Sequence, residues 1–165
     1  MDVLQTFNRH DRQALAFNIA LPVGAGLAVH AVAFALGWYE GNSATPPWFA
    51  LPWWAVATVW LVLLALMATT RWMLNEYTII GVVPARRMVS VLIIACLLWP
   101  VYSAASGSAM VGLIGTVIAA AISFATAIFV WQRSHKGVLP LVPVMLWLAF
   151  TVVMFLAQTG RLQLQ

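Results

Sequence analysis

The sequence predicts an all-α integral membrane protein, built as a bundle of five transmembrane helices. Of its 165 residues, 64% are apolar and only 7% are charged, and the mean hydropathy is +0.96. A water-soluble domain needs far more charge to cover its surface. The apolar residues form five long continuous runs and do not alternate with polar residues, which argues against the strands of a β-barrel. Residues 1–165 are therefore expected to form a single membrane domain.

Each apolar run is long enough to cross about 30 Å of hydrocarbon at about 1.5 Å per residue. The connections between the runs are short and polar, so sequential helices should be antiparallel. Pro22, Gly24 and Gly26 should bend the first helix and let a neighbouring helix approach it closely. The expected spans are 14–37, 52–70, 88–105, 109–131 and 138–157.

Segment 46–60 is uncharged and holds four of the nine tryptophans and three of the eight prolines. Pro46-Pro47 predicts a stiff, non-helical arm, because the residue before a proline is disfavoured in the α conformation. Pro52 suits the first turn of the next helix. Such a group of indoles is typical of an aromatic belt at a membrane surface, and it could also wall a flat, apolar ligand site.

The basic residues act as markers of membrane topology. They are dispersed and form no patch of the kind that binds nucleic acid, so no nucleic-acid partner is expected. Because seven of the eight fall on the N-terminal side of the membrane, the positive-inside rule places the N-terminus in the cytoplasm and the C-terminus outside, as in a bacterial inner membrane. Only Arg161 falls on the other side. The seven are Arg9, Arg12, Arg71, Arg86, Arg87, Arg133 and Lys136.

Small residues recur at helical spacing along the fourth span. Side chains of this size let helices pack closely in lipid, where van der Waals contact replaces the hydrophobic driving force. The pattern indicates either packing inside the bundle or the face of a homodimer. The two lines are Ser108, Gly112, Thr116 and Ala120, and Ala119, Ser123 and Ala127.

Three stretches in order resemble the TspO/MBR family, the tryptophan-rich sensory proteins related to the mitochondrial translocator protein. Segment 38–54 is similar to the family's W-Y … P-P-x-W-x-F-P-x-x-W loop, 98–102 to its W-x-P motif in helix three, and 137–147 to its A-x-x-L-x-x-P-Y-L-x-W motif in helix five. The chain departs from the pattern where Cys96 and Val144 replace a family Asn and Tyr. Polar groups that hold ligands in the family are thus apolar here.

The resemblance implies a TspO-like five-helix fold with a pocket for porphyrins, sterols or related drugs. Planar apolar macrocycles stack on indoles without needing a charged group. His30 is the one histidine inside a span, and it is expected either to bond a neighbouring helix or to serve as a polar or haem contact. The candidate ligand-binding residues are Trp38, Pro47, Trp48, Trp53, Trp54, Cys96, Trp99, Trp147 and Thr151.

The sequence offers no set of groups for hydrolytic or phosphoryl chemistry. Its four acids, Asp2, Asp11, Glu40 and Glu76, lie in loops, and there are too few ligands for a metal cluster. We therefore expect no enzyme, no catalytic or metal-binding residue and no required cofactor.

The expected function is binding of a hydrophobic planar ligand, of the porphyrin, haem or sterol class, by a sensor or carrier whose other partner is the lipid bilayer. Two alternatives stay open. One is an accessory structural subunit of a larger membrane complex. The other is light- or oxygen-dependent porphyrin breakdown, an activity suggested for the family.

Overall fold

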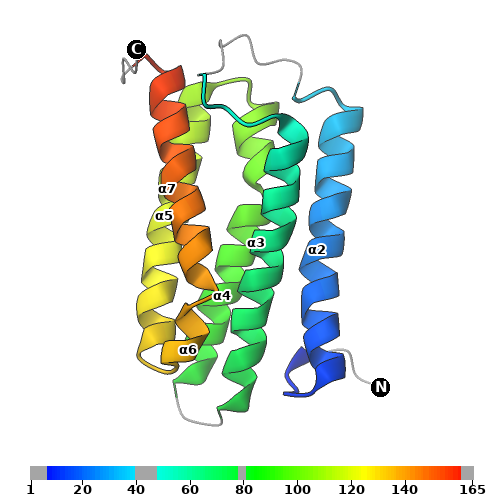
Figure 1. Ribbon diagram of the computed structural model, residues 1–165, viewed down its shortest axis with the longest axis vertical. Helices are drawn as coiled ribbons and strands as arrows, with labels where there is room; N and C mark the ends of the chain where they lie inside the picture. Colours follow the sequence, from blue (N-terminus) through cyan, green and yellow to red (C-terminus); the bar gives the residue numbers. More distant parts are fainter. Residues whose placement is uncertain (1–6, 40–47, 78–80, 161–165) are drawn as a thin grey trace.

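The computed structural model describes residues 7–39, 48–77 and 81–160, and within these ranges it contains helices and turns and no strand. Five helical segments are long and apolar enough to cross a membrane. They stand side by side and alternate in direction, so the two termini lie at opposite ends of the bundle (Figure 1). The predicted all-α, five-helix membrane bundle is confirmed.

Two of the long helices begin after a residue whose side chain accepts a hydrogen bond from a backbone N–H of the first turn. The Asp11 side chain accepts from the backbone N–H of Ala14 at 2.7 Å and caps the first long helix, and Ser108 caps the fourth in the same way. The elements are α2 (Arg12–Ala35), α3 (Trp53–Met73) with the 3-10 turn η1 (Leu74–Glu76), α4 (Val82–Leu97) with the π-helical turn η2 (Val101–Ala105), α5 (Ala109–Trp131), α6 (His135–Val138) and α7 (Leu141–Gln158).

Two helices are longer at their charged ends than the sequence predicted. Helix α3 continues past Arg71 to Met73, and α4 already begins at Val82 instead of residue 88. The extension of α3 is possible because the Arg71 side chain turns into the bundle, where it finds hydrogen-bond acceptors. Pro84 does not interrupt α4, since the first turn of a helix requires no backbone N–H.

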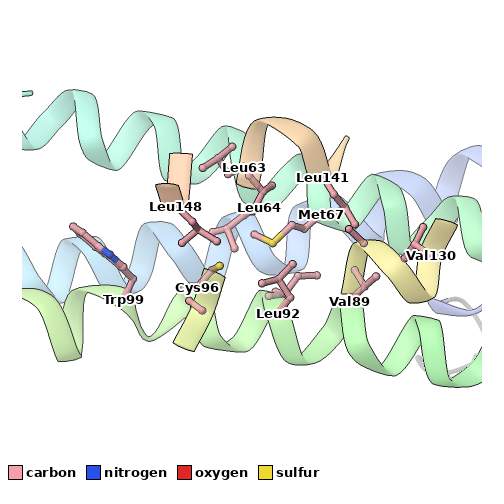
Figure 2. Close-up of a cluster of buried hydrophobic side chains, with 14 of the residues drawn as sticks. Leu63, Leu64, Met67, Val89, Leu92, Cys96, Trp99, Val130, Leu141 and Leu148 are labelled. Carbon is pink, nitrogen blue, oxygen red and sulfur yellow. The ribbon is translucent and has the colours of Figure 1, made fainter. Parts of the chain in front are cut away.

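The hydrophobic core lies where α3, α4, α5 and α7 meet. Its middle contains Leu64, Met67 and Leu92, with Trp99 toward one end and Val130 toward the other (Figure 2). Helix α2 packs on the outside of α3. A Cβ atom on Gly26 would lie 2.6 Å from the Leu64 side chain, so this glycine brings α2 close to α3, as expected from the sequence.

The small residues of α5 face the inside of the bundle. Thr116 and Ser123 are fully buried, and a Cβ on Gly112 would lie 2.5 Å from the ring of Phe155 on α7. Of the two interpretations of this pattern, the structure favours internal packing.

The two ends of the bundle differ in chemistry. At one end, which we call the tryptophan end, α2 ends and α3 begins, and Trp48, Trp53 and Trp54 lie there. At the opposite end, the basic end, α2, α4 and α6 begin (the lower end in Figure 1). Because the helices alternate in direction, all seven basic residues assigned to one side by the sequence gather at this basic end.

Candidate functional site

A groove of about 480 Å³ lies between the middle of α3 and the first half of α7. Its walls are almost entirely apolar, and Trp147 and Phe150 supply the aromatic part, with ring centroids 5.4 Å apart and planes tilted by 35°. The groove opens to the side of the bundle, so a ligand dissolved in the bilayer can reach it. It is lined by Thr58, Val59, Val62, Leu63 and Leu66 of α3 and by Pro143, Leu146, Trp147 and Phe150 of α7.

The arm before α3 extends this aromatic wall. Phe49 lies edge-on to Phe150 at 6.2 Å, and Trp48 lies edge-on to Phe49 at 5.6 Å. Four rings thus follow one another from Trp48 to Trp147. Trp48 is 84% exposed, whereas the indole N–H of Trp147 is buried and finds no hydrogen-bond partner among the described residues. We call this row of four rings, with the groove beside it, the aromatic groove.

A second aromatic cluster lies inside the bundle. Trp60 and Trp99 approach to 5.4 Å, and Trp99 and Phe155 to 6.5 Å. Cys96, one turn before Trp99, is buried in the same core. The indole N–H groups of Trp60 and Trp99 are buried and unpaired within the described residues. The core packs around these side chains, and they line none of the described cavities.

A third cluster joins α2 to the start of α3. Nδ1 of His30 and the hydroxyl of Tyr39 share a hydrogen bond of 2.7 Å. Trp53 stacks on Phe34 at 5.1 Å and on Tyr39 at 6.3 Å. Burial raises the pKa of Tyr39 to about 12, so this phenol stays protonated at neutral pH. The partner Tyr39 lies just after the helix that carries His30, so this is not the expected bond to a neighbouring helix, and the possible haem contact of His30 stays a prediction.

The predicted ligand-binding residues are therefore divided among these places. Two of them, Trp48 and Trp147, belong to the aromatic groove. The hydroxyl of Thr151 is buried behind Trp147 and donates to the carbonyls of Trp147 and Leu148 in its own helix. Trp38 is half-buried after α2, and Trp54 is exposed. Cys96 and Trp99 belong to the second cluster, inside the bundle, and Trp53 belongs to the third. Pro47 lies outside the described residues.

Two of the four rings in the row, Phe49 and Phe150, were not predicted. Phe150 follows Trp147 by three residues, a spacing that puts both on one helix face, so the pattern contained the signal. The only sequence signal for Phe49 was its position next to Trp48. Its contact with Phe150 of α7 joins residues far apart in the chain, so no local pattern indicated that contact.

The described residues bring together no group of three or more His, Cys, Asp or Glu side chains that could hold a metal ion. The fold and the aromatic groove define a five-helix integral membrane protein with an apolar, aromatic-walled groove on its side. The sequence profile of the TspO/MBR family matches residues 18–158, so the chain belongs to this family. A search for similar curated proteins returned no match.

Proposed function

We propose that this TspO/MBR protein binds a planar, hydrophobic ligand of the porphyrin or haem class in the aromatic groove and acts as a sensor or carrier. The observation that carries the proposal is the row of four rings from Trp48 to Trp147 beside an apolar groove of about 480 Å³.

A flat macrocycle suits these walls for two reasons. Aromatic faces and edges attract one another, beyond the gain from burying apolar area. The apolar walls of the groove also bury the flat, apolar faces of the macrocycle, which adds the gain from removing them from contact with the surroundings. A sterol would gain the burial but much less of the ring stacking, so we place the porphyrin class first.

The proposal contains no catalytic step and no resident cofactor, since the porphyrin is the ligand itself. It places the basic end of the bundle, with the N-terminus, at the cytoplasmic surface of an inner membrane and the C-terminus outside. The gathering of seven basic residues at one end supports this orientation.

The test is a titration of the purified protein in detergent with protoporphyrin IX, followed by porphyrin absorbance. We expect binding in the micromolar range and a loss of about tenfold in affinity for Trp147→Ala, which removes one stacking surface. Trp131→Ala is the matched control, because Trp131 is exposed at the basic end. Equal affinities of the two variants would contradict the proposal.

Two further measurements distinguish the alternatives. Under illumination, porphyrin absorbance should decay no faster with the protein than with free tryptophan, and faster decay would favour porphyrin breakdown. Failure to bind any porphyrin, with recovery of the protein in a larger complex under mild detergent, would favour an accessory subunit. Recovery as a monomer or homodimer is expected.

A further inference from the structure

The basic end contains a buried guanidinium whose hydrogen-bond partners among the described residues are all neutral. Arg71, in the last turn of α3, is 8% exposed. Its Nη1 donates to the side-chain oxygen of Asn18 at 2.8 Å and to the carbonyl of Phe7 at 3.1 Å. The other two acceptors, Asn8 Oδ1 and Ser90 Oγ, lie at 3.3 and 3.2 Å. Buried charges in proteins are normally paired with an opposite charge, and none of these four acceptors carries one.

Arg71 is the point where two cavities meet. One, of about 450 Å³, lies against the first turns of α4, and its lining combines Arg71, Arg86 and Arg87 with the apolar Val83, Val91 and Ile94. The other, of about 340 Å³, is apolar and lies between α2, α3 and α4. Arg71, Ser90 and Ile94 line both cavities, so the two adjoin at these three side chains and together make up one candidate site.

The site has the shape and polarity of an amphiphile. Along α4, the lining changes from Arg86 and Arg87 through Ser90 to Ile94 and Leu97, a distance of about 16 Å at about 1.5 Å per residue. On the facing helix it changes from Asn18 to apolar residues in the same direction. The apolar part is lined by Leu21, Pro22 and Ala25 of α2 and by Ile93, Ile94 and Leu97 of α4.

We propose that this site binds one anionic phospholipid, with its phosphate at Arg71, Arg86 and Arg87 and one acyl chain in the apolar slot between α2 and α4. Guanidinium groups bind phosphate through paired hydrogen bonds, and basic pockets between transmembrane helices at the membrane surface attract anionic headgroups. A zwitterionic phospholipid would place the same acyl chain in the slot, but its headgroup carries no net negative charge to pair with the arginines. The inference is independent of the proposed function, because the lipid site lies at the basic end and the aromatic groove on the other side of α3.

Native mass spectrometry of the purified protein, with added phosphatidylglycerol or phosphatidylcholine of identical chains, tests the charge requirement. We expect one phosphatidylglycerol to remain bound with about tenfold preference over phosphatidylcholine. The double variant Arg86→Gln/Arg87→Gln should lose that preference. Arg12→Gln/Lys136→Gln removes the same charge from the same end, outside both cavities, and should keep it. An equal loss in both double variants would mean general surface attraction and would overturn the proposal.

A second pair of variants tests the acyl slot. Ala25→Phe fills the slot, whereas Ala28→Phe adds the same ring at an exposed position one turn away on α2. Only Ala25→Phe should lose the bound phosphatidylglycerol. Unchanged binding by Ala25→Phe would contradict a seated chain. Glycerol phosphate, which has no chain, should not displace the lipid at equal concentration, and if it does, the site binds free phosphate and the lipid proposal fails.

Discussion

Gly24 and Gly26 are two positions apart on α2 and meet different surroundings. A Cβ on Gly26 would lie 2.6 Å from the side chain of Leu64 and 3.3 Å from that of Leu61, both on α3. A Cβ on Gly24 would have no neighbour within 4 Å. One glycine therefore sets the separation of two helices, while the other faces open space.

Gly26→Leu should lower the free energy of unfolding by about 1–3 kcal/mol, because added methylenes in a packed contact force neighbouring side chains out of position. Gly24→Leu should leave it unchanged or raise it slightly, since leucine favours a helix more than glycine does. Thermal unfolding in detergent measures both. Equal midpoints for the two variants would mean that α2 does not pack on α3 through Gly26.

The packing of individual side chains was predictable where the spacing of residues within one helix indicates it. The helical spacing of Gly112 and Thr116 predicted a close helix contact, and the contact exists. The environment of Arg71 was not predictable in the same way. A charge at the end of an apolar run indicates a membrane boundary, yet this side chain is buried by Asn18 and the backbone of Phe7, which lie far from it in the chain.

At the scale of elements, hydropathy located all five helices, and helix ends were less accurate where charges occur. The apolar runs of α2 and α5 gave bounds within a few residues of those observed, because their ends coincide with capping residues. For α3 and α4 the charged residues were assigned to a loop. Arginine has a long side chain that can stay inside a helix and bond acceptors elsewhere, so charge alone does not end a helix.

The grouping of aromatic residues depended on helix rotation, which the sequence did not determine. Trp99 and Trp147 were expected to share one pocket, but Trp99 points into the core and Trp147 lines the groove. Periodicity within one helix places residues on a face, as with Trp147 and Phe150. It does not say which neighbouring helix that face meets.

At the scale of the whole molecule, the separation of a basic end from a tryptophan end predicts its orientation in the membrane. In a Cys96→Ser background, cysteine replaces either exposed Ser106, in the turn before α5, or exposed Gln132, just after α5. A membrane-impermeant maleimide applied to intact spheroplasts should label Ser106→Cys, and Gln132→Cys only after lysis, because the positive-inside rule assigns the basic end to the cytoplasm. The reverse pattern would contradict this orientation.

The proposed function depends most on the aromatic groove as the place where a planar ligand binds. Val62→Trp adds a bulky ring at an exposed position of α3 that lines this groove. Ile118→Trp adds the same ring at an equally exposed position that lines another cavity, between α4 and α5. The measurement is the dissociation constant of protoporphyrin IX for both variants and the unchanged protein.

We predict that Val62→Trp weakens protoporphyrin IX binding about tenfold, since the ring occupies the space that the ligand needs, while Ile118→Trp binds as the unchanged protein does. Unchanged affinity of Val62→Trp, with loss of binding by Ile118→Trp, would place the ligand between α4 and α5 and contradict the central claim.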